Sequence, residues 1–186
     1  MKSGSCRIIA GRWRGRKIRF DGAVGLRPTT DRIRETVFNW LQPYLYQCRC
    51  LDVFAGSGVL GFEALSRGAA EATFIESNKQ TAMSLRKNTG ELGATGVVIH
   101  NDDALQWLLS VPDKQCFNLV FLDPPFHSEL LEKSAMILSS SGILADDAII
   151  YVEHGVGADI SLPENWSCIR EKRAGQVSYR LFTPVS

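Results

Sequence analysis

Hydrophobic positions along the chain follow two patterns that alternate from about residue 31 onward. Short, nearly continuous apolar runs are typical of buried strands, and they fall at residues 50–54, 72–76, 97–100, 117–122 and 148–153. Between these runs, apolar residues recur at helical spacing, over residues 31–45, 59–67, 78–92, 107–109 and 130–138. Strands that alternate with helices predict βαβ units, and therefore an α/β fold built on a parallel sheet.

Near each end of the chain, the pattern of residues predicts a β-hairpin in place of a βαβ unit. Near the N-terminus, residues 6–10 and 16–20 read as two short strands on either side of a glycine-bounded turn. Near the C-terminus, residues 168–182 read as a hairpin that turns at Ala174-Gly175. We expect this second hairpin to complete the sheet as an antiparallel pair.

The apolar run at residues 117–122 ends in Asp123-Pro124-Pro125-Phe126. Neither proline has an N–H, and Pro125 forces Pro124 toward an extended conformation, so the Pro124 carbonyl is left to accept from a ligand. With the Asp123 carboxylate it makes two acceptors, which suit the two N–H groups of an exocyclic amine. Phe126 adds a flat face on which a planar base could stack. Asp-Pro is also a common turn opener, but its position after a buried strand favours the functional interpretation.

A glycine-rich turn follows the run at residues 50–54 and opens a helix, with Gly56, Gly58 and Gly61 in a G-x-G-x-x-G pattern. Glycine lets the backbone approach a ligand, and a helix N-terminus favours anionic groups. Glu76, twenty residues after Gly56, ends the next strand and is placed to accept hydrogen bonds from ribose hydroxyls. Dehydrogenases that bind dinucleotides share both features. The glycine turn and Glu76 therefore predict a ligand that contains a nucleoside, but they do not identify that ligand.

The Asp123-Pro124-Pro125-Phe126 segment resembles the (Asp/Asn/Ser)-Pro-Pro-(Tyr/Phe) signature of amino-methyltransferases that use S-adenosylmethionine (SAM). Residues 6–20, 26–36 and 170–176 resemble the RsmD family of bacterial small-subunit rRNA guanine-N2 methyltransferases. The resemblance covers nearly the full chain. It implies the Rossmann-like fold of class I SAM-dependent methyltransferases, with a seven-stranded mixed sheet and a basic N-terminal β-hairpin extension.

The resemblance also implies how SAM is held. The glycine turn would contact the carboxylate of the methionine moiety. The sequence of the turn, Phe-Ala-Gly-Ser-Gly at residues 54–58, resembles the form of this pattern found in SAM-binding proteins. In this fold family an Asp-Ala pair after the third strand lies beside the adenine, a role that we carry over to Asp103, although helix N-capping is the rival role for Asp102 or Asp103. The cofactor-binding residues that we expect are Asp52, Phe54, Gly56, Gly58, Glu76, Asp103 and Ala104.

The net charge of +1 hides a strong asymmetry along the chain. Residues 1–34 hold ten Lys and Arg against two Asp, a net charge of +8, so the remaining residues carry −7. A basic arm on an acidic body suits a polyanionic partner, because each Lys or Arg near a phosphate releases a condensed counterion. We predict that the hairpin grips RNA and that Trp13 is available for stacking; a merely solvated charged face is the alternative. The RNA-binding residues that we expect are Arg7, Arg12, Trp13, Arg14, Arg16, Lys17, Arg27, Arg32, Lys172 and Arg173.

Composition fits a small protein with one main core. The 186 residues are 45% hydrophobic and show no repeat, so we expect a methyltransferase domain at residues 29–186 and an RNA-binding hairpin extension at residues 1–28. No apolar run reaches membrane length and the N-terminus has no apolar signal core, which predicts a cytoplasmic protein without a membrane partner. Five cysteines without a C-x-x-C pair indicate reduced thiols and no metal site. We expect a monomer.

These observations together predict a SAM-dependent enzyme that methylates the exocyclic N2 amine of a guanine in 16S rRNA, in the small ribosomal subunit or an assembly intermediate. The catalytic residues that we expect are Asp123, Pro124 and Phe126. The nucleotide must be unpaired or flipped out, because its amine has to leave the base stack to reach the pocket. The choice of guanine N2 over adenine N6 rests on the resemblance alone. An adenine-N6 methyltransferase and a non-catalytic SAM-binding assembly factor stay open as alternatives.

Overall fold

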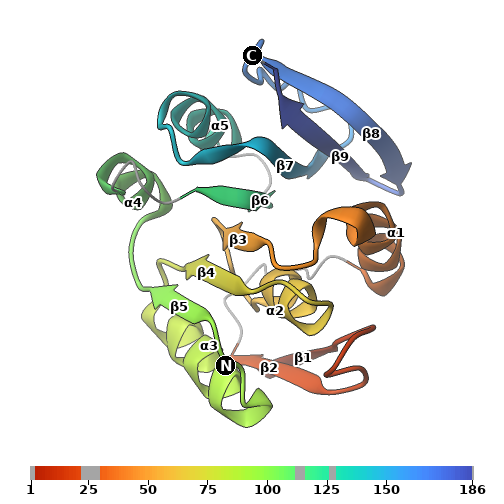
Figure 1. Ribbon diagram of the computed structural model, residues 1–186, viewed down its shortest axis with the longest axis vertical. Coiled ribbons are helices and arrows are strands. Elements are labelled where there is room, and N and C mark those ends of the chain that lie inside the picture. Colours follow the sequence, from red (N-terminus) through yellow and green to blue (C-terminus); the bar gives the residue numbers. More distant parts are fainter. Residues whose placement is uncertain (1–2, 22–29, 112–115, 126–128, 186) are drawn as a thin grey trace.

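The computed structural model describes residues 3–21, 30–111, 116–125 and 129–185. Figure 1 labels the helices and strands of this part of the chain. In chain order they are β1 (Ser3–Arg7), β2 (Lys17–Asp21), α1 (Asp31–Leu41), the 3-10 helix η1 (Gln42–Tyr44), β3 (Arg49–Asp52), α2 (Val59–Ser66), β4 (Glu71–Ile75), α3 (Lys79–Leu92), β5 (Val97–His100), α4 (Ala104–Ser110), β6 (Phe117–Leu122), α5 (Leu130–Ser140), β7 (Leu144–Gly155), β8 (Trp166–Ala174) and β9 (Val177–Pro184).

Seven of the described strands form one mixed sheet, in the order β5-β4-β3-β6-β7-β9-β8. β5, β4, β3, β6 and β7 run parallel, whereas β9 is antiparallel to both of its neighbours. The seven-stranded mixed sheet and its antiparallel last pair are therefore confirmed. The β1–β2 hairpin forms a separate two-stranded sheet.

Helices cover both faces of the sheet and give it two hydrophobic cores (Figure 1). α1, α2 and α3 pack in one core, and α4 and α5 pack in the other. Successive residues of the central strand β6 enter opposite cores: Leu119 and Phe121 lie in the first, and Val120 and Leu122 in the second. A strand buried on both faces reads as a continuous apolar run, which is why β6 stands out in the sequence.

α1 crosses the sheet over its centre. The rings of Phe38 on α1 and Phe121 on β6 lie 5.9 Å apart, centroid to centroid. The α-helix ends at Leu41 and continues as the 3-10 turn Gln42–Tyr44, which contains Pro43. Proline has no N–H for the α-helical ladder, so its position in the sequence already predicts that this helix bends or ends early.

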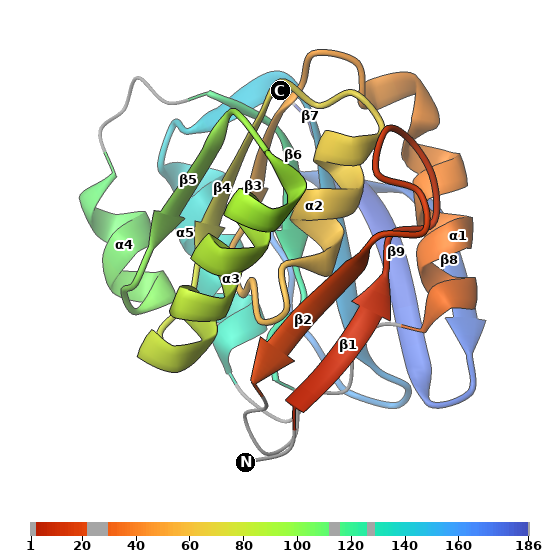
Figure 2. The ribbon, with the colours of Figure 1, turned by 90° about the horizontal axis from the view of Figure 1, so that it is seen from below.

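The β1–β2 hairpin packs against α2 and α3, on the side of these helices that faces away from the sheet (Figure 2). Ile8 and Ile18 are buried in the same core as the apolar residues of α2. Asn88 on α3 exchanges two hydrogen bonds with the backbone of Arg19: its Oδ1 accepts from the Arg19 N–H at 3.1 Å, and its Nδ2 donates to the Arg19 carbonyl at 2.8 Å. The hairpin thus shares its core with the rest of the chain, and the expected domain boundary at residue 28 lies outside the described residues.

The buried carboxylate of Glu63 on α2 holds the start of the hairpin turn. Its Oε2 accepts from the Ile9 N–H at 2.7 Å, and its Oε1 accepts from the Ala10 N–H at 3.0 Å and from Arg67 Nε at 2.7 Å. Arg34 Nη1 lies 3.7 Å from Glu63 Oε2. The N–H groups of Ile9 and Ala10 therefore bind this carboxylate and not a neighbouring strand. For this reason β1 ends at Arg7, whereas the sequence pattern predicts a strand that ends at residue 10.

Trp13 belongs to this docked turn, and the prediction that it is available for stacking on RNA is wrong. Its side chain is 7% exposed and packs in the first core. Its backbone N–H donates to Ser66 Oγ at 3.0 Å, and the Arg12 guanidinium lies 4.0 Å from the centre of its ring. Burying the large apolar indole is more favourable than leaving it in water, and the sequence does not reveal that α2 offers a surface for it.

We expect the Glu63→Gln substitution to lower the free energy of unfolding by about 3–5 kcal/mol, because it leaves the buried Arg67 without its anionic partner and leaves Arg34 with only Asp31. Chemical denaturation would measure the change. The matched control is Glu71→Gln, which removes an exposed ion pair with Arg49 (2.9 Å) and should cost less than about 1 kcal/mol. Equal, small effects of the two substitutions would show that the Glu63 network does not hold the hairpin.

Candidate active site

Four loops meet at one edge of the sheet. β3, β4, β5 and β6 are neighbouring parallel strands, so their carboxyl ends point the same way. The loops that follow them carry the glycine turn, Glu76, Asp103 and Asp123 respectively. Ligands of open α/β sheets bind at this edge, and the fold therefore brings together the segments that the sequence singles out.

The glycine turn between β3 and α2 requires its glycines. Gly56 and Gly58 have φ values of 50° and 76°, in the left-handed region. A Cβ atom on Gly58 would lie 2.4 Å from Leu85 Cδ2 and 2.9 Å from Phe62 Cε2. The turn therefore presents backbone, not side chains, at the start of α2, which suits the close approach of a ligand.

Asp52 ends β3 beneath this turn and is 2% exposed. Its Oδ2 accepts a hydrogen bond from the Gly61 N–H at 3.3 Å, which ties the first turn of α2 to the strand. Burial raises the pKa of Asp52 to about 7, with the Gly61 N–H opposing the rise and the nearby Glu76 adding to it. Asp52 supports the turn from below, and any contact of its side chain with SAM stays a prediction.

Glu76, at the end of β4, is half-buried and also binds the turn. Its Oε2 accepts from the Gly56 N–H at 2.9 Å, and its Oε1 accepts from the Asn78 N–H at 2.7 Å. Burial raises the pKa of Glu76, and these two N–H groups oppose the rise. Each oxygen has a further acceptor site, so the carboxylate is held in place and can still accept from ribose hydroxyls.

Asp103 caps the N-terminus of α4. This is the role that the sequence analysis gives as the alternative to binding adenine. Its Oδ1 accepts from the Leu105 and Gln106 N–H groups, both at 3.0 Å, while Asp102 Oδ1 accepts from the Asp103 N–H at 2.8 Å. The N-cap therefore falls to Asp103 itself. Capping occupies one oxygen and fixes the carboxylate at the sheet edge, so contact of the other oxygen with an adenine amino group stays a prediction, as does a contact from the buried Ala104.

Asp123 and Pro124 follow β6 at the centre of the same edge. Asp123 is half-buried, Pro124 is buried and Pro125 is exposed. β6 pairs directly with β3, and the Val53 N–H donates to the Phe121 carbonyl at 3.2 Å. The loop that carries Asp123 and the glycine turn thus start from adjacent strands. Phe126 lies outside the described residues.

Two neighbours of this loop carry no site role in the sequence-based prediction. Tyr151 and Glu153 on β7 are both buried, and the Tyr151 hydroxyl donates to Glu153 Oε2 at 2.6 Å. The signal in the sequence is a carboxylate at the end of an otherwise apolar run, which is the same signal that marks Asp123. Phe54, expected at the cofactor, is half-buried and packs against the second core.

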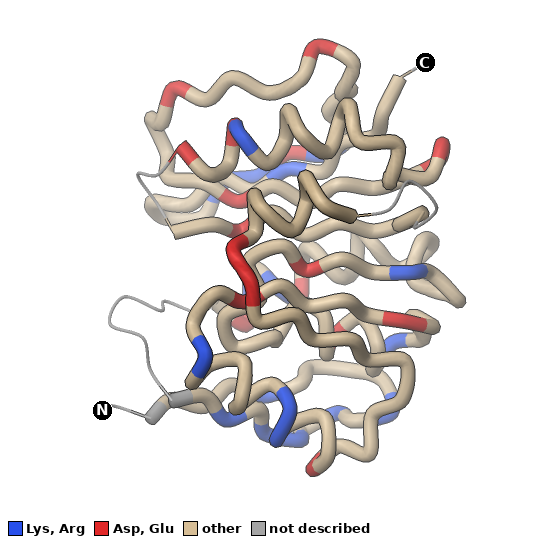
Figure 3. The backbone as a smooth tube through the Cα atoms, turned by 90° about the vertical axis from the view of Figure 1, so that its left-hand side faces the viewer, with Lys and Arg blue, Asp and Glu red and all other residues tan. Residues whose placement is uncertain are grey.

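The residues expected to bind RNA fall into two separate groups. Five of the expected residues are exposed on the hairpin: Arg7, Arg12, Arg14, Arg16 and Lys17. Lys and Arg gather at the end of the molecule that carries the hairpin and α3 (Figure 3). Lys172 and Arg173 are exposed on β8, at the opposite end of the sheet (Figure 1).

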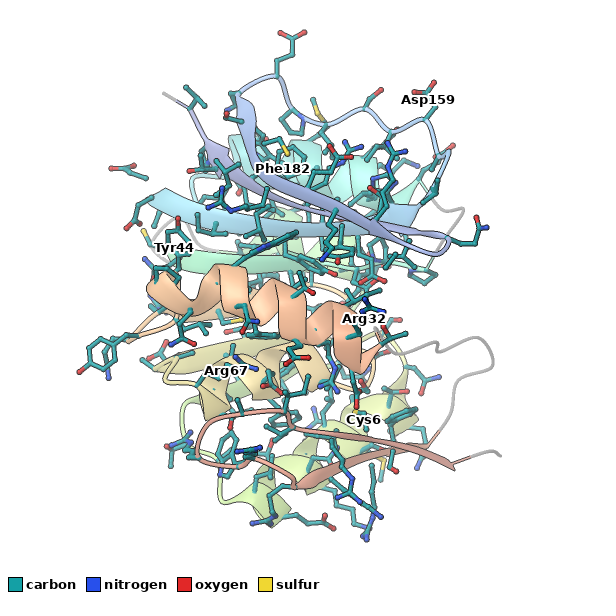
Figure 4. All side chains as sticks on the ribbon, turned by 90° about the vertical axis from the view of Figure 1, so that its right-hand side faces the viewer. Cys6, Arg32, Tyr44, Arg67, Asp159 and Phe182 are labelled. Atoms are coloured by element: carbon teal, nitrogen blue, oxygen red, sulfur yellow. The ribbon has the colours of Figure 1, made fainter. Side chains whose placement is uncertain are left out.

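The start of α1 lies between these two groups. Arg32 is exposed there, above the hairpin that carries Cys6 (Figure 4). Its neighbour Arg34 is fully buried, and Arg34 Nη2 donates to the Arg7 carbonyl at 2.9 Å. Arg34 is therefore a structural residue, although its charge counts toward the basic arm in the sequence. Arg27 lies outside the described residues.

The donor and acceptor set at the sheet edge fits a nucleoside that carries an amino acid chain. A glycine turn at a helix N-terminus suits a carboxylate, and Glu76 suits a pair of ribose hydroxyls. Among the described residues, no group of three or more His, Cys, Asp or Glu side chains is placed to hold a metal ion. Within the same part of the chain, no helix is long and apolar enough to cross a membrane.

The fold and this site define a class I SAM-dependent methyltransferase. The chain belongs to the family described as "Conserved hypothetical protein 95", whose model matches residues 6–183. It is 50% identical over 181 residues to "Ribosomal RNA small subunit methyltransferase D" of Escherichia coli (strain K12), covering 97% of this chain and 90% of that protein. It is 48% identical over 181 residues to the protein of the same name from Haemophilus influenzae, with 96% and 94% covered. The solved structure of a "Putative methyltransferase yhhF from Escherichia coli" superposes with a TM-score of 0.87 at 48% identity, covering 98% of this chain and 99% of that chain.

The raised pKa of Asp52 predicts a pH dependence of stability. Its pKa is about 7 in the folded protein and 3.8 in the unfolded chain. The folded state therefore holds the proton more tightly, and the stability that this provides is complete below about pH 4 and lost as the pH rises through 7. We expect Asp52→Asn, which cannot ionise, to become more stable relative to the parent protein over this range, by about 2–4 kcal/mol. Denaturant titrations at pH 4.5, 6 and 8 would measure it; a constant difference at all three would contradict the assignment.

Proposed function

We propose that this protein transfers a methyl group from SAM to the exocyclic N2 amine of a guanine in 16S rRNA. The observation that carries the proposal is the position of Asp123 and Pro124, which directly follow β6, the strand that pairs with the one leading into the glycine turn. The names of the relatives from Escherichia coli and Haemophilus influenzae support small-subunit rRNA as the substrate class. The resemblance to the RsmD family supports guanine N2 as the methylated atom.

The two acceptors address the main chemical difficulty of the reaction. An amine conjugated to a purine ring is a poor nucleophile, because its lone pair is delocalised into the ring. Asp123 and the Pro124 carbonyl can accept its two N–H bonds and so help the nitrogen become pyramidal, with the lone pair directed away from them. These hydrogen bonds strengthen as positive charge develops on the nitrogen, so they stabilise the transition state more than the bound substrate.

Bound SAM would supply an electrophilic methyl group on a sulfonium. Glu76 and the glycine turn would hold the nucleoside and methionine ends, and Asp103 would face the adenine. The new N–C bond forms as the sulfur–methyl bond breaks, and the nitrogen then carries one proton too many. The Asp123 carboxylate or a water molecule can take this strongly acidic proton.

The exposed basic residues support RNA as the partner. The hairpin exposes basic side chains, which suit contacts to the phosphates of a folded RNA and not recognition of base edges in a groove. The target base must be extruded to reach a loop at the sheet edge. We propose the small subunit or its assembly intermediate as the physiological substrate, because such a particle holds a defined nucleotide in an accessible form.

Asp123→Ala should lower methyl transfer by at least about a hundredfold, because it removes one of two groups that stabilise charge on the amine. SAM binding should be retained. The assay measures transfer of labelled methyl groups to small subunits purified from cells lacking this protein, followed by digestion to nucleosides. Asp146→Ala, an exposed carboxylate on β7, is the control and should be fully active. Unchanged transfer by Asp123→Ala would refute the mechanism, and N6-methyladenosine as the product would establish the adenine alternative.

The double substitution Arg14→Gln and Lys17→Gln should weaken RNA binding and reduce the slope of log affinity against log salt by about one per lost phosphate contact. Both side chains are exposed and make no hydrogen bond or ion pair with another described residue, so the fold should be unaffected. Filter binding or fluorescence anisotropy at several salt concentrations would measure the slope. Lys133→Gln on α5 is the control. An unchanged slope would exclude the hairpin from the RNA interface.

A further inference from the structure

β2 and α3 together carry a basic surface that extends beyond the residues assigned from the sequence. The two elements lie side by side (Figure 2). Their exposed charged residues, counted where the structure describes the side chain, are five bases and one acid, Glu91. We call the five bases the β2–α3 surface; they are Lys17, Arg19, Lys79, Arg86 and Lys87. The chain beyond residue 34 has a net charge of −7, yet α3 contributes three of these bases.

Backbone contacts fix β2 against α3 and leave the basic side chains outside. Asn88 binds both the N–H and the carbonyl of Arg19, whose side chain is exposed. Arg16 Nη2 donates to the carbonyl of Glu91 at 2.5 Å, near the end of α3. β2 and α3 therefore run in opposite directions, and Lys87, next to Asn88 in the chain, lies close to Arg19.

The three bases of α3 share its solvent-facing side. Residues seven apart lie on the same side of a helix, so Lys79 and Arg86 are aligned, about 10 Å apart along the axis. Each residue advances the helix by about 100°, which places Lys87 about 100° from Asn88 and Arg86 about 200° from it. Lys87 thus lies on the flank nearer the hairpin, and the other two bases lie beyond it.

The surface leads from the hairpin to the candidate active site. The N-cap of α3 is Asn78, whose N–H donates to Glu76 Oε1 at 2.7 Å, so Lys79 lies at the sheet edge where SAM binds. The hairpin turn lies farther from this edge. Its Arg12 N–H donates at 2.8 Å to the carbonyl of Ser66, the last residue of α2, whereas the glycine turn stands at the start of that helix.

The five side chains of the β2–α3 surface are available to a ligand. None of them makes a hydrogen bond or an ion pair with another residue that the structure describes. In the hairpin, by contrast, the guanidinium groups of Arg7 and Arg16 donate to backbone carbonyls, and that of Arg12 lies over the Trp13 ring. Like charges gathered without acids repel one another, and a polyanion relieves this repulsion and releases counterions.

We propose that the β2–α3 surface binds phosphates of the rRNA that leads to the target nucleotide. Arg19, Lys79, Arg86 and Lys87 are then RNA-binding residues, in addition to those of the hairpin. Phosphate contacts position an RNA without reading its sequence, so this surface would hold the RNA while the Asp123 loop receives the base. The inference rests on the proposed function for the identity of the RNA, and it extends the interface from the hairpin to the sheet edge.

The first experiment measures binding to protein-free 16S rRNA by filter retention at several salt concentrations. The double substitution Lys79→Gln and Lys87→Gln keeps good helix formers on α3. It should lower the affinity about tenfold at about 0.1 M salt, and reduce the slope of log affinity against log salt by about two. The control is Arg49→Gln with Lys133→Gln, which removes the same charge from β3 and α5 and should change neither quantity. A slope no lower than that of the control would overturn the proposal.

Arg19→Gln tests the β2 side of the surface. Asn88 binds only the main chain of Arg19, so both hydrogen bonds remain and the denaturation midpoint should stay within a few degrees of the parent. The slope should fall by about one. An unchanged slope would exclude β2 from the surface and overturn the proposal in this form.

The second experiment measures methyl transfer to small subunits from cells lacking this protein. The Lys79→Gln, Lys87→Gln variant should raise the KM for subunits about tenfold, with kcat and SAM affinity unchanged, because phosphate contacts bind substrate and transition state equally. If the KM for subunits rises while the affinity for protein-free rRNA stays that of the parent, the surface binds an acidic protein of the particle, and the RNA assignment is overturned.

Failure of this inference can be told from failure of the proposed function. If the α3 variant binds RNA as its control does while Asp123→Ala loses methyl transfer, only this inference fails. If Asp123→Ala transfers methyl groups normally, the proposed mechanism fails, and the RNA affinities still decide whether the β2–α3 surface binds RNA.

Discussion

The direct pairing of β3 with β6 is the constraint on which the rest of the structure depends. These strands are far apart in the sequence, yet the register of Asp52 with Phe121 makes them neighbours in the sheet. The glycine turn and the Asp123 loop therefore leave the same edge next to one another. No local property of either segment produces this proximity. It follows from the crossover in strand order, which creates a place for ligands between loops that diverge to opposite faces.

The N-terminal hairpin shows how charge and packing are combined in a small protein. Its exposed side chains are basic, but Glu63, Asn88 and Ser66 bind its backbone, and Ile8 and Ile18 complete the core. These contacts stabilise a short two-stranded sheet that would be marginal alone in water. A hairpin fixed in this way presents its arginines from a rigid surface, so less conformational entropy is lost when RNA binds.

The sequence predicts the sheet well because its central strands are apolar on both faces and its turns carry glycine and proline. It also predicts that Asp123, Glu76 and the glycine turn meet, since all follow parallel strands. It fails where the outcome depends on a partner distant in the sequence. Trp13 is buried because α2 offers Ser66 and an apolar surface, and β1 ends early because Glu63 competes for its N–H groups. Asp103 caps α4, and local sequence offers Asp102 equally for that role.

Glu63 and Glu153 are two carboxylates that are almost fully buried. Glu63 is surrounded by two backbone N–H groups and the guanidinium groups of Arg67 and Arg34, which is the environment of a carboxylate that serves the fold. The Tyr151 hydroxyl donates to Glu153 Oε2 at 2.6 Å, and burial together with the charges of Glu153 and Asp123 raises the pKa of Tyr151. The hydroxyl therefore stays protonated and keeps this hydrogen bond on β7, next to the strand that leads into the Asp123 loop. One buried carboxylate thus fixes the backbone of the hairpin, and the other fixes a side chain beside the candidate active site.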